Sequence, residues 1–221
     1  MELSSDAVRA ESVTPAAEAS LGATLWRVAW MATLLGLVLD VLVFVAAATA
    51  GQAGDARPFA ADLVQKVSWG VIVCVAVALG SAATSFRSQL MGLLGLLAAP
   101  FALNVAGALH RAASQAIALT AASAAGPSPW VVGGLKGLEY GLLGLAVGWI
   151  ERRPWGGLAA HAAVGLAAGL VFGGALVYLR AQAGPATAPD LVAAAINEVL
   201  FPVGCALILF TAEALGRRAR L

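Results

Sequence analysis

Six long apolar segments, separated by short polar breaks, constrain the fold of this chain more than any other feature. An α-helix needs ~20 predominantly apolar residues to cross the ~30 Å hydrocarbon core of a bilayer, and every segment is about that long. We therefore predict an all-α, polytopic bundle of six transmembrane helices. The predicted spans are residues 25–50, 67–85, 90–109, 130–150, 155–179 and 191–214.

The composition is typical of a protein surrounded by lipid. The 221 residues are 61% hydrophobic and 11% charged, whereas soluble domains carry about 25% charged residues. The net charge of +1 offers no basic face for phosphate, which argues against a nucleic-acid partner. We expect one membrane domain over 25–216, a flexible polar tail at 1–24 and a basic end at 217–221. The tail lacks the basic start and apolar core of a cleavable signal peptide.

Basic residues indicate the direction of the spans, because lysine and arginine collect in cytoplasmic loops. With the N-terminus inside, eight of the 13 basic residues lie on the cytoplasmic side, four lie outside and Lys136 lies in the membrane. An even number of spans returns the chain to its starting side, so both termini should be cytoplasmic. The many arginines, alanines and glycines are typical of a GC-rich bacterial genome, and we expect the bacterial plasma membrane.

The tryptophans give a second indication of the span boundaries, where amphipathic rings are favoured. All six lie near a predicted span end. They are Trp26, Trp30, Trp69, Trp130, Trp149 and Trp155.

Residues 111–125 are difficult to assign, because they are alanine-rich and moderately apolar. Three arrangements are compatible with this composition: the residues extend the third span, lie flat on the outer surface, or form an ordered loop. We favour a short interfacial helix.

Glycines recur at helical spacing in two spans. Helix association in lipid depends on close backbone approach at small residues, because the hydrophobic drive between helices is weak there. We predict two grooves for neighbouring helices, formed by Gly137 with Gly141 and by Gly165, Gly169 and Gly173. They serve packing within one monomer, or they dock a second copy or another membrane subunit. We favour packing within the monomer.

Four ionisable residues lie within the apolar spans, namely Asp40, Lys136, Glu139 and Glu198. A charge at the bilayer centre costs at least ~2.5–3.5 kcal/mol on insertion scales, so such residues usually face a partner, a cavity or a pathway. At a rise of about 1.5 Å per residue, all four lie between the membrane midplane and the outer surface. Asn104 and Asn197 fall at a similar depth.

At a shared depth these groups form either a wet cavity or a dry network of ion pairs, and we favour the cavity. Lys136 is placed to pair with Asp40, Glu139 or Glu198. Three carboxylates against one ammonium leave two excess negative charges, so either a carboxyl is protonated or a cation completes the site. Pro100 and Pro202 interrupt helical hydrogen bonding nearby. The predicted binding residues are Asp40, Asn104, Lys136, Glu139, Tyr140, Asn197 and Glu198.

The sequence lacks the constellations that enzymes and nucleotide-driven transporters need. His161 lies in a stretch that resembles the histidine helix of rhomboid proteases, but no serine stands in the required Gly-x-Ser-Gly setting. We interpret His161 as a packed or interfacial histidine. The sequence has no Walker loop or dinucleotide fingerprint, and its histidines and cysteines are not grouped as metal ligands are. We predict no enzymatic activity, no cofactor and no metal.

We expect a small solute-binding or transport subunit with a polar site in the outer half of the membrane. Six spans, this chain length, cytoplasmic termini and the lack of an ATPase motif resemble in outline the substrate-binding subunits of energy-coupling-factor vitamin transporters. The resemblance is architectural and assigns no residues. The alternative is a non-catalytic assembly or scaffold subunit of a larger membrane complex.

Cysteine labelling in intact cells tests the predicted orientation. Cysteines in place of Asp55 and Ser128 should react with a membrane-impermeant thiol reagent, because both positions lie in predicted outer loops. A cysteine in place of Arg153 should not react. The unsubstituted chain, whose Cys74 and Cys205 fall within spans, is the control. Labelling at position 153 would reverse the orientation and move the polar site to the cytoplasmic side.

Overall fold

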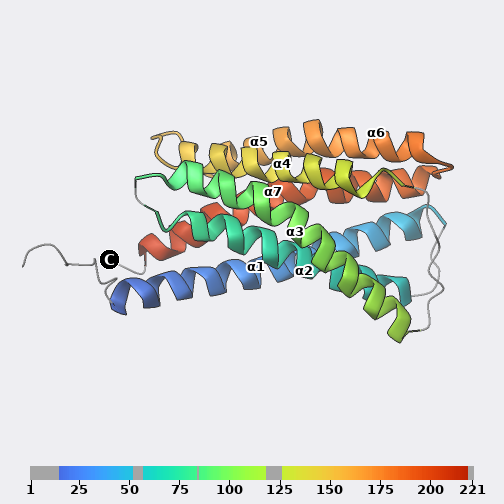
Figure 1. The fold of residues 1–221 in the computed structure, drawn as a ribbon, viewed down its shortest axis with the longest axis horizontal. Coiled ribbons are helices and arrows are strands. Elements are labelled where there is room, and N and C mark those ends of the chain that lie inside the picture. The colour runs from blue at the N-terminus through green and yellow to red at the C-terminus, as the bar shows by residue number, and fades with distance from the viewer. Residues whose placement is uncertain (1–14, 52–56, 84, 118–125, 219–221) are drawn as a thin grey trace, which may run out of the picture.

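A computed structural model describes residues 15–51, 57–83, 85–117 and 126–218. All regular structure within these ranges is helical (Figure 1). The elements in chain order are α1 (Pro15–Thr49), α2 (Arg57–Gly80), α3 (Arg87–Ala116), α4 (Pro129–Ile150), α5 (Leu158–Ala168), the π-helical turn η2 (Gly169–Gly173), α6 (Gly174–Ala183) and α7 (Ala188–Arg218).

Six helices in the described ranges are long and apolar enough to span a bilayer. One of them, Leu158–Ala183, consists of α5, η2 and α6 running on without a break. The predicted all-α bundle of six transmembrane helices is therefore confirmed, and the fold is that of a multi-pass membrane protein. The cytoplasmic location of both termini stays a prediction.

Two helices begin earlier than predicted. α1 begins at Pro15, so the last ten residues assigned to the flexible tail are helical; residues 1–14 lie outside the described ranges. α2 begins at Arg57 rather than at residue 67. Its first turns contain polar residues that suggested a loop, but three of them line a cavity within the bundle. A prediction based on polarity alone therefore placed the start of α2 too late in the chain.

The interfacial helix predicted for 111–125 is wrong for the residues that the structure describes. α3 continues through Pro100 as far as Ala116, so it includes 111–116. Alanine has the highest helix propensity, which favours continuation of the existing helix over a new one. Residues 118–125 lie outside the described ranges. At the other end of the chain, α7 runs on to Arg218, beyond the predicted end at 214.

α7 lies at the centre of the bundle. It contacts α1, α2, α4, α5, η2 and α6, and in Figure 1 it runs between α4 to α6 on one side and α1 on the other. α3 packs against both α2 and α4 and crosses the bundle obliquely. This arrangement brings the polar residues of α4 and α7 to the same interior region.

The glycine row of the fifth span allows close contact with α7. A Cβ atom at Gly165 would lie 2.6 Å from the Cα atom of Val203, and one at Gly169 would lie 2.9 Å from the Cα atom of Val199. At Gly173 it would lie 2.7 Å from the carbonyl carbon of Glu198. Because real Cβ contacts are longer, any side chain here would separate the two helices. The row therefore fixes the segment of α7 that carries Glu198.

The second predicted groove packs α4 against α3. A Cβ atom at Gly137 would lie 3.0 Å from the carbonyl oxygen of Leu96, and one at Gly141 would lie 3.2 Å from the Leu96 Cβ atom. Both glycine sets are thus covered by helices of the same chain, as we favoured. The alternative, that they form a free seam for a second copy or subunit, is wrong for these five glycines.

Five of the six tryptophans are exposed, namely Trp26, Trp30, Trp130, Trp149 and Trp155. The last three lie at the ends of α4 or in the turn that follows it, as the boundary prediction requires, whereas Trp26 and Trp30 lie well inside α1 because that helix begins at Pro15. Trp69 departs from the prediction in both respects. Because α2 begins ten residues early, Trp69 lies in the middle of that helix and packs against the ring of Tyr140.

Replacing Gly169 by valine should destabilise the protein by roughly 1–3 kcal/mol, because the new side chain overlaps the backbone of α7. Gly174→Val is the matched control, since a Cβ atom there meets nothing within 4 Å. The measurement is the temperature at which the detergent-solubilised protein loses its monodisperse elution peak. Equal melting of the two variants would contradict the packing described for η2.

Candidate functional site

Lys136 is held between two glutamates. Its Nζ atom lies 2.7 Å from Oε2 of Glu139 in the next turn of α4, and 2.5 Å from Oε2 of Glu198 in α7. All three side chains are largely or fully buried, and buried charges are stable only when they are paired and hydrogen-bonded. The predicted pairing of Lys136 with Glu139 and Glu198 is therefore confirmed.

Asp40 pairs with Lys66 of α2 in place of the predicted Lys136. The early start of α2 explains the difference, because it carries Lys66 into the bundle beside α1 rather than leaving it in a loop. Asp40 is almost fully buried. Its role is to hold Lys66, whose side chain is slightly more accessible.

Arg180 supplies a further cation at this level. The sequence placed it in an outer loop, but it lies in α6 with its Nη2 atom 3.3 Å from Oε1 of Glu198. Its side chain remains 47% exposed. Together with the two lysines it provides one positive charge for each of the three buried carboxylates. The two negative charges predicted to be in excess among these three carboxylates are therefore compensated by Lys66 and Arg180, which were assigned to loops.

The rings of Trp69 and Tyr140 lie beside the Lys136 ammonium, and Phe201 packs against Tyr140. Tyr140 lies edge-on to Trp69 and to Phe201, with ring centroids 5.9 and 6.4 Å apart. The Lys136 Nζ atom lies 5.9 Å from the Trp69 ring centroid and 5.7 Å from that of Tyr140. Such contacts stabilise a desolvated ammonium through the negative face of the ring.

A cavity of about 350 Å³, here called the inner cavity, opens beside these groups within the bundle. Residues of α1, α2, α3, α4, α6 and α7 line it, so all six spans contribute. Its polar lining consists of Asp62, Gln65, Lys66, Lys136, Arg180, Asp190, Asn197 and Glu198. Its apolar lining consists of Val43, Trp69, Leu103, Val132, Ala193, Ala194 and Phe201.

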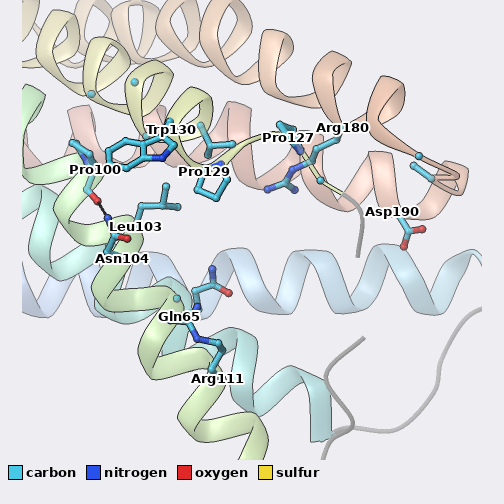
Figure 2. A pocket seen from close by; sticks show the side chains of 18 of the residues that line it. Gln65, Pro100, Leu103, Asn104, Arg111, Pro127, Pro129, Trp130, Arg180 and Asp190 are labelled. Atoms are coloured by element: carbon cyan, nitrogen blue, oxygen red, sulfur yellow. Dashed lines mark hydrogen bonds between the residues drawn. The ribbon is translucent and has the colours of Figure 1, made fainter. Parts of the chain in front are cut away.

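A larger cavity of about 1040 Å³, the outer cavity, adjoins the inner one (Figure 2). It is bounded by the start of α4 and by the connection between α6 and α7, at the end of the bundle that the distribution of basic residues predicts to face outward. The residues that line both cavities are Gln65, Leu103, Val132, Arg180 and Asp190. The Arg180 side chain thus stands where the two cavities meet.

The two predicted asparagines line different cavities. Asn104 is exposed in the outer cavity, where its amide nitrogen donates a hydrogen bond of 2.8 Å to the carbonyl oxygen of Pro100 (Figure 2). Asn197 lines the inner cavity. Its Oδ1 atom is buried and accepts no hydrogen bond from the part of the chain that the structure describes.

The predicted set thus divides into a lining and a support. Lys136, Asn197 and Glu198 line the inner cavity. Asp40, Glu139 and Tyr140 do not line either cavity, and they hold the lining residues from behind. The suggestion that Tyr140 lines the pocket is therefore wrong, because its ring is fully buried among its neighbours.

Four lining residues of α2 escaped the sequence prediction, namely Asp62, Gln65, Lys66 and Trp69. Their spacing of three, four and seven residues places them on one face of a helix. This periodicity is the sequence signal that could have identified them, because it extends α2 toward its observed start at Arg57. Arg180 offered no such signal, because it belongs to the last turn of its helix.

A second polar network lies at the opposite end of the bundle. Arg87 at the start of α3 pairs with Glu151, which follows α4, at 2.6 Å and also with Glu213 of α7. His161 of α5 is fully buried, with its ring centroid 4.9 Å from that of Phe210. The interpretation of His161 as a packed histidine is therefore confirmed. This network joins three helices at the end remote from the two cavities.

Comparison with family models, with curated protein sequences and with solved structures finds no match for this chain. The fold and the site together define a multi-pass α-helical membrane protein with a charged cavity between its helices. A finer assignment depends on the chemistry of that cavity.

Removing the shared cation should expose the dependence of the site on charge pairing. Lys136→Met leaves Glu139 and Glu198 buried without their common partner, which should destabilise the protein by roughly 3–5 kcal/mol. Adding Glu139→Gln and Glu198→Gln to that variant should restore most of the loss. The measurement is the midpoint of unfolding in mixed micelles with increasing dodecyl sulfate. If Lys136→Met were as stable as the variant with all three substitutions, charge pairing would not be what holds the site together.

Proposed function

We propose that this protein binds a small polar solute in the inner cavity and serves as a solute-binding or transport subunit of a bacterial plasma membrane. The inner cavity is the observation that carries the proposal. Six charged side chains and two amides line a space of about 350 Å³ inside a bundle of apolar helices. Small-molecule sites in proteins typically occupy about 300–1,000 Å³.

An open cavity supports a binding site over a purely structural ion-pair network. Buried ion pairs contribute little net stability compared with apolar residues of similar volume. A network that served stability alone would close around its charges and leave no space. Here the charges of Arg180 and Glu198 border open volume, and the Arg180 side chain is 47% exposed. These features support a hydrated site.

The outer cavity provides a route to this site. It adjoins the inner cavity at the end of the bundle that the distribution of basic residues orients outward. Six spans around an outward-facing site resemble in outline the substrate-binding subunits of energy-coupling-factor transporters. Because the sequence contains no nucleotide-binding motif, we propose that any coupling to ATP comes from a separate subunit.

The scaffold alternative has less support. It relied on the glycine-rich faces as docking surfaces, and those glycines pack against α3 and α7 of the same chain. The buried charges likewise pair within the chain.

A substitution that fills the inner cavity without altering a charge tests the proposal. Ala193→Phe projects a large side chain from the cavity wall and should abolish retention of a co-purifying small molecule, as read by native mass spectrometry from mild detergent. Val192→Phe is the matched control, because Val192 is exposed and lines neither cavity. If both variants retained the molecule equally, its binding site would lie outside the inner cavity. Stoichiometric membrane partners with no retained molecule would instead favour the scaffold.

A further inference from the structure

The cations of the inner cavity differ in how firmly the protein holds them. Lys66 pairs with Asp40, and Lys136 pairs with both Glu139 and Glu198. Among the residues that the structure describes, Arg180 has one ion pair, a 3.3 Å contact with Glu198, and its side chain is the most exposed of the three. A guanidinium has five N–H donors in a planar fork. Arg180 is therefore the cation with unused donors at the junction of the cavities.

An unused guanidinium fork is suited to a carboxylate. Arginine binds a carboxylate through two parallel hydrogen bonds, and the planar match makes this one of the strongest polar contacts in proteins. Arg180 points into the space between the helices (Figure 2) and lines both cavities. A solute carboxylate entering from the outer cavity would meet Arg180 at the junction of the two cavities.

Binding of a carboxylate at Arg180 alone would upset the charge balance of the site. Arg180 neutralises one of the two glutamates that share Lys136. If its guanidinium turns toward a solute, Glu198 and Glu139 are left with one ammonium between them. Buried charge of one sign is costly. The solute must therefore bring a positive group to Glu198.

The protein also offers acceptors for such a positive group. Oε1 of Glu198 carries the long contact to Arg180, while Oε2 is bound to Lys136. The neighbouring Asn197 lines the same cavity, and its Oδ1 atom accepts no hydrogen bond from the described residues. An ammonium has three donors to share between these oxygens.

From this charge balance we infer that the solute is a zwitterion of amino-acid size, with its carboxylate on Arg180 and its ammonium on Glu198 and Asn197. The inference rests on the proposed function of the inner cavity. The apolar part of the wall, which includes Trp69 and Phe201, suits an apolar side chain. In the free site Arg180 and Glu198 pair with each other, and the zwitterion replaces that pair without a change in net charge.

Matched probes separate the two charged ends of the solute. L-leucine, L-phenylalanine and L-tryptophan are compared with their amides, which lack the carboxylate, and with 4-methylpentanoate, 3-phenylpropionate and indole-3-propionate, which lack the ammonium. Titration calorimetry on the detergent-purified protein should show that at least one amino acid binds. Its amide and its desamino analogue should bind about tenfold more weakly or worse, since each leaves a charged group unpaired.

Two variants assign the carboxylate end. Arg180→Gln, which changes a partly exposed side chain, should bind the amino acid and its amide equally. Arg153→Gln at the opposite end of α4 should keep the preference of the unaltered protein, because Arg153 packs on Trp149 and lines neither cavity. An amide that binds as well as its amino acid, or an unchanged preference in Arg180→Gln, would overturn the inference.

The outcomes also distinguish this inference from the function on which it rests. A retained molecule that is not a zwitterion, with no binding of the three amino acids, would overturn the inference and leave the binding site intact. No retained molecule and no binding of any probe would overturn both.

Discussion

Lys136 pairs with Glu139 of its own helix and with Glu198 of α7, and the second ion pair joins α4 to α7, so that the arrangement of the site depends on it. An ammonium within a membrane-spanning helix cannot remain unpaired at an acceptable cost. It therefore requires that the face of α7 carrying Glu198 turn toward α4. The same segment packs closely against η2, where Gly173 leaves no room for a side chain next to Glu198. Charge pairing with α4 and close packing against η2 together determine where Glu198 lies.

The two ends of the bundle differ in how their charged side chains are arranged. At one end the cations and carboxylates are arranged around open space, and the outer cavity adjoins it. At the other end Arg87 draws Glu151 and Glu213 together. Between them lies apolar packing that includes Cys74 and Cys205, whose sulfur atoms are 3.1 Å apart. The site is thus accessible from one end of the bundle, which suits a binding protein oriented across a bilayer.

Much of the candidate site was predictable, because depth along a helix follows from counting residues. Lys136, Glu139 and Glu198 were expected at one level and are paired there. The cations Lys66 and Arg180 were missed, since a polar residue near a span end reads equally well as loop or as helix. The partner of Asp40 was wrong as a consequence. Which charges balance one another depends on how each helix is rotated about its axis, and residue counting does not give that rotation.

The sequence by itself determined the class of the protein. Apolar segments of about 20 residues have to cross a bilayer as helices, since their backbone polar groups find no partners in lipid other than one another. It also determined that charges within those helices would need partners. The tertiary structure decided which partners they have and where space remains. Both depend on contacts between helices distant in sequence, such as that between Gly173 and the backbone of Glu198, where the absence of one side chain sets the position of another.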